Sequence, residues 1–199
     1  MKDHFINKAG SYEANNKRVQ NVANIADTVI ATIDFDPSMQ LMDFGSGTGL
    51  LLERIAPQVK KISAVDISPS MMAQLLVKQD SIDCDLETLQ IDLEKQDIDK
   101  KYDGIISSMT MHHIADIRAM FKKFYRMLNE GGFIAIADLD TEDGSFHDED
   151  TGVHHFGFDR SAFLEQARHV GFKNLQITDA NIINKPHADF GVFLLTAYK

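Results

Sequence analysis

Cysteine, clustered basic residues and long apolar runs are all scarce in this chain of 199 residues. Its single cysteine, Cys84, excludes an internal disulfide, which is typical of proteins in a reducing compartment. The nearby acids Asp83, Asp85 and Glu87 should raise the pKa of that thiol, so we expect no catalytic thiolate. No apolar run reaches about 18 residues and the first residues lack a signal-like apolar core. We therefore expect a cytoplasmic protein that does not enter a membrane.

The charge of the chain is one-sided. Thirty acidic residues stand against 20 basic ones, which gives a net charge of −10. Because no cluster of Lys and Arg offsets this charge, the chain should repel a phosphate backbone, and we expect no nucleic-acid partner. The length suits one domain with a sizeable core, and 44% hydrophobic residues is ordinary for a globular enzyme.

Apolar periodicity predicts that helices and strands alternate along the chain. Helical spacing runs from Val19 to Ile33, and again from Ile114 to Leu128, where 129–132 should end the helix. Short apolar runs predict strands at 40–44, 61–67, 86–91, 102–109 and 133–139. This order is typical of an α/β fold with a doubly wound, largely parallel sheet. A further helix at 161–172 and two strands joined as a hairpin, at 173–180 and 191–198, complete the pattern.

We expect these elements to form a single domain with four parts. They are a helical leader or lid (1–36), a cofactor-binding core (37–139), an acidic loop with histidines (140–158), and a C-terminal helix with a strand hairpin (159–199). Long loops in compact domains are more often functional than idle, so His147, His154 and His155 are candidates for a substrate lid. A merely solvated loop is the alternative. The acidic loop shows no established spacing of metal ligands, and we expect no metal there.

The glycine turn in "LMDFGSGTGLL" (41–51) favours close approach of a ligand to the backbone, because glycine adopts left-handed conformations without strain. A phosphate-binding loop is excluded, since Leu50 and Leu51 follow the last glycine where Lys-Ser/Thr is required. A nicotinamide fingerprint is disfavoured, because the glycines are spaced G-x-G-x-G rather than G-x-G-x-x-G. A tight strand-to-helix turn without any ligand stays open on the glycines alone.

Two acids near the glycine turn narrow the choice of ligand. Asp43 precedes the turn, where a carboxylate would repel a pyrophosphate but could order the amine of an amino acid. Asp66 ends the next strand, 17 residues after Gly49, where it could accept both hydroxyls of an unphosphorylated ribose. A ligand with an amino acid at one end and a nucleoside at the other fits both acids, and S-adenosylmethionine is such a ligand.

With these motifs in order, the chain resembles the class I S-adenosylmethionine-dependent methyltransferases, in their small bacterial type. "LMDFGSGTG" (41–49) resembles the first motif of that family and "AVDIS" (64–68) the acidic end of its second strand. "IDLEKQDIDKKYDGIISSMTMHHI" (91–114) and "LNEGGFIAIADL" (128–139) resemble the third-to-fourth-strand and fifth-strand motifs. "FINKAGSYEANNKRVQNVANIA" (5–26) resembles a leader segment of such enzymes. The resemblance implies a Rossmann-like sheet of seven strands with the last strand antiparallel.

The resemblance also implies roles for individual residues toward the cofactor. The turn residues would wrap its methionine part, Asp66 would bind the ribose, and Ile67 would pack on the adenine. Asp92 would accept from the adenine amino group, although Asp at this position could instead be a turn cap. The full set implied to bind the cofactor is Asp43, Gly45, Ser46, Gly47, Gly49, Asp66, Ile67, Asp92, Leu93, Ser108, Met109, Tyr12 and Arg18.

The acceptor of the methyl group is a separate question. His112 and His113 follow the fourth strand at the ligand-binding edge of the sheet, so one of them is a candidate catalytic or substrate-contacting group. A helix-entry polar pair is the alternative. The segment after that strand, "SSMTMHH", lacks the Asn/Asp-Pro-Pro-aromatic motif of amino-group nucleic-acid methylases, which together with the acidic charge favours a small-molecule acceptor. A cofactor-binding regulator without transfer activity and a nicotinamide oxidoreductase are the competing functions.

Overall fold

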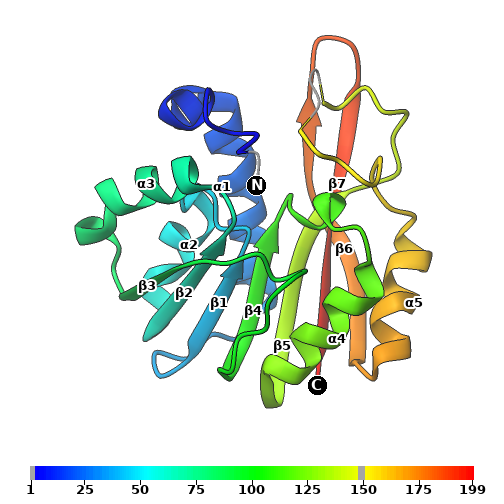
Figure 1. Cartoon of the computed structure of the whole chain (residues 1–199). Helices are drawn as coiled ribbons and strands as arrows, with labels where there is room; N and C mark the ends of the chain where they lie inside the picture. Colours follow the sequence, from blue (N-terminus) through cyan, green and yellow to red (C-terminus); the bar gives the residue numbers. More distant parts are fainter. Residues whose placement is uncertain (1–2, 148–150) are drawn as a thin grey trace.

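The computed structural model describes residues 3–147 and 151–199 (Figure 1). Its helices and strands alternate over most of the chain, as the apolar periodicity predicts. In chain order they are α1 (Asn16–Thr32), β1 (Gln40–Phe44), α2 (Leu50–Ile55), β2 (Lys61–Asp66), α3 (Pro69–Val77), β3 (Asp85–Gln90), β4 (Tyr102–Ser108), α4 (Ile117–Met127), β5 (Leu128–Leu139), α5 (Arg160–Val170), β6 (Lys173–Asn184) and β7 (Asp189–Tyr198).

All seven strands form one sheet in the order β3-β2-β1-β4-β5-β7-β6. The first five strands are parallel, and β7 is antiparallel to both of its neighbours, β5 and β6. Strand β7 therefore runs against the other six. The predicted α/β fold, with a seven-stranded and mostly parallel sheet whose last strand is antiparallel, is confirmed.

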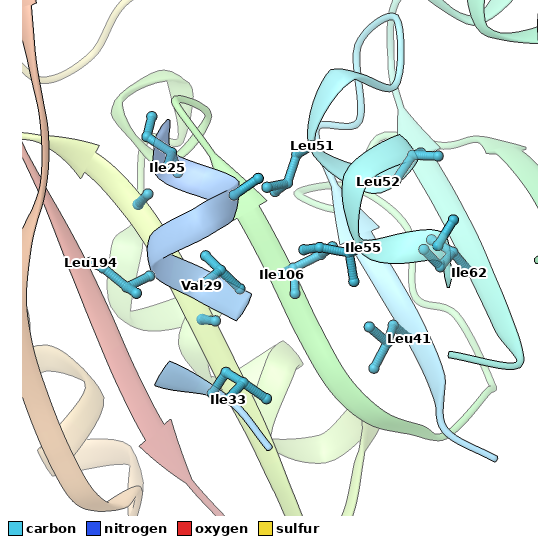
Figure 2. Close-up of a cluster of buried hydrophobic side chains, with 14 of the residues drawn as sticks. Ile25, Val29, Ile33, Leu41, Leu51, Leu52, Ile55, Ile62, Ile106 and Leu194 are labelled. Atoms are coloured by element: carbon cyan, nitrogen blue, oxygen red, sulfur yellow. The ribbon is translucent and has the colours of Figure 1, made fainter. Parts of the chain in front are cut away.

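Two apolar layers hold helices against the two faces of the sheet. On one face, Ile25 and Val29 of α1 pack near Leu51 and Ile55 of α2, over Ile106 of β4 (Figure 2). The aromatic side chains of α4 and α5 form the core of the other face, with Phe121, Phe124 and Phe163 fully buried. Because burying one such side chain stabilises the fold by about 1.5–3 kcal/mol, these layers fix the sheet on which the site is built.

Helix α4 and its neighbouring strands differ from the expected boundaries. The helix begins at Ile117 rather than at Ile114, because the carboxylate of Asp116 accepts the backbone N–H of Ala119 at 2.9 Å and caps it. Residues 129–132 were expected to end this helix, but they already lie in β5, whose first residue Leu128 pairs with Tyr102 of β4. At the other end of the chain, β6 continues to Asn184, beyond the expected strand, because it keeps pairing with β7.

One edge of the sheet collects the chain segments that carry candidate residues. The carboxyl ends of the parallel strands point toward this edge, where the N-terminal segment, the acidic loop and the β6–β7 hairpin also lie (Figure 1). Ligands bind at such an edge in open α/β sheets. Within the described residues, no helix has the length and apolar character needed to cross a membrane.

Candidate functional site

The glycine turn (45–49) requires glycine at two places for steric reasons. Gly45 and Gly49 have φ angles of +72° and +89°, a region that other residues rarely adopt. A Cβ on Gly45 would lie 2.2 Å from the hydroxyl oxygen of Thr110, and one on Gly49 would lie 2.5 Å from Leu75. The turn is thus held tightly between β4 and α3. These contacts explain two glycines without any ligand.

Gly47 differs, because nothing lies within 4 Å of a Cβ built on it, although its φ is +55°. Its backbone N–H donates to Oδ2 of Asp66 at 2.7 Å, and the N–H of Ser68 donates to Oδ1 at 2.8 Å. Burial raises the pKa of Asp66 above its usual value, and these backbone hydrogen bonds oppose that shift. The turn and the end of β2 therefore form one unit beside open space.

Asp43 is buried behind the glycine turn without a partner for one oxygen. The residue is 1% exposed, and its Oδ2 has no hydrogen-bond partner among the described residues. Burial raises the pKa of this carboxyl to about 8, and the nearby charge of Asp66 adds to the effect. An orphaned buried carboxyl is rare in native proteins and calls for an incoming partner. A cationic amine would satisfy it, so this donor set fits the amino-acid end of S-adenosylmethionine.

The remaining residues implied for the cofactor lie at the same edge but differ in their freedom. Ile67 is 50% exposed after β2, as an adenine-packing residue should be, whereas Ser46 and Leu93 are buried. Asp92 already caps a turn, since it accepts the N–H of Glu94 at 3.0 Å and the ammonium of Lys95 at 2.6 Å. Its role toward adenine stays a prediction.

The end of β4 is strained where it meets the glycine turn. Met109 has a φ of +57°, which is costly for a residue with a side chain and is concentrated at functional sites in proteins. The hydroxyl of the preceding Ser108 is buried without a partner among the described residues. Thr110 follows, and its hydroxyl donates to the carbonyl oxygen of Gly45 at 3.4 Å. The fourth-strand motif thus abuts the first motif.

The N-terminal segment covers this side of the site. The guanidinium of Arg18 lies 4.1 Å from the centre of the Tyr12 ring and donates to the Tyr12 carbonyl at 2.8 Å. Burial raises the pKa of the Tyr12 phenol, Arg18 opposes that shift, and the charge of Asp66 adds to it, which places the phenol near Asp66. Asp3 accepts the hydroxyl of Ser68 at 2.9 Å, at the start of α3. No feature of the sequence predicts this contact of Asp3.

The acceptor candidates lie in a short 3₁₀ helix, the histidine turn (Met111–His113). His112 is 1% exposed, and its Nδ1 lies 2.7 Å from Oδ1 of Asp138, the penultimate residue of β5. The backbone N–H of His112 donates to the other oxygen of Asp138 at 3.2 Å. Nε2 of His112 is buried without a partner among the described residues. Asp138 lies one residue before the end of an apolar strand and Asp66 at the end of another, so an acid near a strand end was the signal that could have identified Asp138 as a candidate.

His113 and His147 complete a cluster of imidazole rings around His112. Their ring centres lie 4.3 Å and 5.1 Å from that of His112. Burial lowers the pKa of both side chains to about 4, and the nearby His112 adds to the effect, so both rings are neutral at pH 7. Within residues 3–147 and 151–199, no three His, Cys, Asp or Glu side chains are placed to hold a metal ion.

The acidic loop is fastened to the histidine turn rather than extended into solvent. The backbone N–H groups of His154 and His155 donate to the carbonyl oxygen of His112 at 2.9 Å and 3.1 Å. His147 lies 3.2 Å from the hydroxyl of Thr151 through its Nδ1. His154 thus contacts the turn through its backbone, whereas His155 also uses its ring, whose Nε2 lies 2.9 Å from the carbonyl oxygen of Ile114. Of the three, His147 contributes a ring to the cluster around His112. Residues 148–150 of this loop lie outside the described residues.

Comparison with known proteins identifies the family of the chain. Residues 16–177 match the family model described as a methyltransferase domain. The chain is 28% identical over 134 residues to a malonyl-[acyl-carrier protein] O-methyltransferase of Priestia megaterium, covering 66% of this chain and 48% of that protein. It spans between about half and three fifths of the length of the curated relatives that it matches first.

Solved structures share the fold. A structure of a methyltransferase of Haloferax volcanii in complex with the Trm112 methyltransferase activator has a TM-score of 0.83 at 17% identity, covering 100% of this chain and 98% of that chain. The phosphoethanolamine N-methyltransferase 2 of Haemonchus contortus, solved with phosphomonomethylethanolamine and S-adenosylhomocysteine, has a TM-score of 0.71 at 16% identity, covering 90% of this chain and 52% of that chain. With the family model matching most of its length, the chain belongs to the class I S-adenosylmethionine-dependent methyltransferases.

Proposed function

We propose that this chain transfers the methyl group of S-adenosylmethionine to a small-molecule acceptor. The observation that carries the proposal is the buried Oδ2 of Asp43, which has no partner among the described residues and precedes a glycine turn in which Gly47 faces open space. A cationic amine can enter there and complete the hydrogen bonding of the carboxylate. When bound, the cofactor supplies an activated methyl group, and the residues of the chain contribute mainly by aligning the reactants.

The remaining cofactor contacts follow from the same edge of the sheet. Asp66 binds the ribose hydroxyls with its carboxylate, which two backbone N–H groups already orient. Ile67 packs on the adenine with its exposed side chain, and Tyr12 with Arg18 closes the ribose side. The backbone at 46–49 and 108–109 surrounds the amino-acid part. This assignment depends mainly on Asp43 and Asp66. Neither acid is paired with a cation among the described residues, and each would bind a different end of one ligand.

The histidine turn supports a small acceptor rather than a macromolecule. The acidic loop is hydrogen-bonded to this turn, and His112 is only 1% exposed, which favours a small acceptor. The net charge of −10 opposes binding to a nucleic-acid backbone. An acceptor borne on a carrier protein, as the name of the Priestia relative describes, requires the loop to move aside.

Calorimetry with S-adenosylhomocysteine tests the cofactor site. We expect Asp66→Ala to lower the affinity at least 100-fold, since it removes the ribose acceptor. Asp97→Ala should leave it unchanged, because Asp97 pairs with Lys123 and Arg126 on the surface. Asp66→Asn keeps one carbonyl acceptor and should fall between the two. Unchanged affinity in a folded Asp66→Ala variant, or tighter binding of NADH than of S-adenosylhomocysteine, would overturn the assignment. Transfer itself is measured with a tritiated methyl donor and a panel of small acceptors. Cofactor binding without any transfer across a broad panel would favour a regulatory protein.

A further inference from the structure

We propose that His112 and Asp138 form a base dyad, and that the acceptor therefore attacks through a protonated oxygen or nitrogen, that is, a hydroxyl or an amine. The inference rests on the proposed methyl transfer and names the class of acceptor that this site serves. Asp138 is a positioning residue in this arrangement, because it contacts His112 rather than the reacting atoms.

The hydrogen bonds around Asp138 fix which nitrogen of His112 carries a proton. The carboxylate accepts two backbone N–H groups, from Leu139 at 2.7 Å and from His112 at 3.2 Å. A carboxylate used in this way acts as an acceptor toward the ring as well, so Nδ1 of His112 is the donor in the 2.7 Å contact. The other nitrogen, Nε2, is then left with a free lone pair. This is the tautomer that a histidine base requires.

The lone pair of Nε2 has no donor in the described part of the chain, although the atom is fully buried. Leaving a buried acceptor unsatisfied destabilises the fold, and native proteins retain such an atom mainly where function requires it. An incoming hydroxyl or amine would supply the missing donor. The same cost argues against a purely structural pair, which would satisfy both nitrogens.

The surroundings of Nε2 leave it free to take a proton. Within residues 3–147 and 151–199, the ionisable groups facing His112 are Asp138 on β5, His113 on its own turn and His147 on the acidic loop, with Lys8 and Lys185 close to His147. The two neighbouring histidines are neutral at pH 7, because burial lowers the pKa of each to about 4. Among the described residues, Asp138 supplies the anion in direct contact with the ring, and it stabilises the imidazolium that forms.

The position of His112 relative to the glycine turn completes the geometry. Thr110, two residues before His112, contacts the carbonyl of Gly45, and Met109 donates to the carbonyl of Ala137, directly before Asp138. The dyad therefore lies over β4 and β5, adjacent to the turn assigned to the methyl donor. An acceptor between the two would have its attacking atom near Nε2 on one side and the methyl group on the other.

The chemistry balances with these groups alone. A lone pair on the acceptor oxygen or nitrogen forms the new bond to the methyl carbon, the electron pair of the broken carbon–sulfur bond stays on sulfur, and the acceptor proton passes to Nε2 of His112. The imidazolium then returns this proton to solvent. A carboxylate acceptor carries no proton at pH 7, so it would not need a base such as the dyad.

NMR of the histidine side chains tests the dyad without relying on activity. In protein labelled with ¹⁵N-histidine, we expect His112 to be the Nδ1–H tautomer at pH 7. Asp138→Asn keeps the volume but offers an amide that can donate to Nδ1, so the ring should change to the Nε2–H tautomer, as in the comparable aspartate-to-asparagine change of a serine protease. Asp140→Asn is the matched control, because Asp140 pairs with Arg160 and not with a histidine. An Nε2–H tautomer in the unmodified protein, or no change in Asp138→Asn, would overturn the proposal.

Transfer measurements then identify the acceptor class. A set of aromatic compounds with one ring and different substituents (phenol, primary amine, carboxylate and thioether) is offered with the tritiated donor. We expect turnover only of the phenol or the amine, and a loss of at least 100-fold in Asp138→Asn, with the affinity for S-adenosylhomocysteine unchanged within twofold. Turnover of the carboxylate or thioether at the same rate in both proteins would overturn the dyad while leaving the methyl-transfer function intact. Loss of S-adenosylhomocysteine binding in the unmodified protein would instead overturn the proposed function, and the tautomer would still decide the dyad.

Discussion

The site has a donor side, formed by Asp43, the glycine turn and Asp66, and an acceptor side, formed by the histidine turn, Asp138 and His147. Burial shifts the pKa values of the ionisable groups on these two sides in opposite directions. On the donor side, burial raises the pKa of Asp43 to about 8, so an acid is held neutral until a cation arrives. On the acceptor side, burial lowers the pKa of His113 and His147 to about 4, so bases are held neutral. Both sides exclude water and thereby penalise charge. Because the pKa shifts have opposite signs, rising pH should destabilise the donor side and falling pH should destabilise the acceptor side.

The largest expected effect is on the donor side. Because the folded-state pKa of Asp43 lies above its unfolded value of 3.8, the stabilisation from its neutral form is complete below about pH 4 and is lost as pH rises through about 8. The side chain in Asp43→Asn cannot ionise. As pH rises between these values, the free energy of unfolding of this variant should increase relative to that of the unmodified protein, by up to about 5 kcal/mol. Urea unfolding of both proteins at several pH values measures the gain.

The same residue makes a prediction for ligand binding. A bound ammonium favours the ionised carboxylate, so binding of S-adenosylhomocysteine at pH 7 should release close to one proton from Asp43. Calorimetry in buffers with different ionisation enthalpies counts that proton, and Asp43→Asn should release none. Equal proton release by both proteins would show that the amine does not bind at this carboxyl.

Two glycines of the donor side separate folding from binding. Gly45→Ala places a methyl group against Thr110 at positive φ, and should lower the free energy of unfolding by about 3 kcal/mol. Gly47→Ala meets open space, so only its left-handed backbone opposes the change, at about 1 kcal/mol. The ranking of the two variants should be reversed for binding. Gly47→Ala should lower the affinity for S-adenosylhomocysteine more than Gly45→Ala, since only the methyl group at position 47 would point into the space assigned to the ligand. Chemical denaturation with calorimetry checks both, and equal stability losses would contradict the different packing of the two glycines.

These two sides also differ in how far the sequence predicts them. The donor side is built from residues close together in sequence: Asp43 and Gly45 to Gly49 lie on one strand and its turn, and Asp66 ends the next strand. Spacing rules apply to such local arrangements, so strand, turn and acid could be assigned before the structure was known. The same alternation of elements predicts the doubly wound, largely parallel sheet.

The acceptor side depends on contacts between distant residues. His112, Asp138 and His147 meet only because β4 and β5 are neighbours and the acidic loop folds back over their ends. Spacing along the chain carries no information on such a contact, and for this reason the pairing of His112 with Asp138 could not be predicted. The boundary of α4 was missed for a different reason, since the cap by Asp116 outweighs the apolar pattern that begins at Ile114.

Acid should weaken the acceptor side by a smaller amount. The folded-state pKa of His147 lies below its unfolded value of 6.5, so the stabilisation from its neutral form is present above pH 6.5 and is lost as pH falls through about 4. His147→Phe keeps a ring beside His112 and cannot titrate. Over this range its free energy of unfolding should therefore fall by about 2 kcal/mol less than that of the unmodified protein. His169→Phe, which makes the same replacement at an exposed histidine of α5, is the matched control. Parallel acid curves for all three proteins would mean that the loop does not bury His147 in solution.

The smallest effect concerns Asp92, whose two possible roles make different predictions. As a turn cap it accepts the N–H of Glu94, so Asp92→Ala should lower the free energy of unfolding by about 1 kcal/mol whatever its role toward the cofactor. If it also accepts from the adenine amino group, the variant should bind S-adenosylhomocysteine about tenfold more weakly but S-inosylhomocysteine, which lacks that group, with unchanged affinity. Asp92→Asn, which keeps a carbonyl acceptor, should preserve most of both. Equal losses of affinity for the two ligands would restrict Asp92 to its structural role. The donor side would then recognise its cofactor through Asp43 and Asp66, without a contact from Asp92 to the adenine amino group.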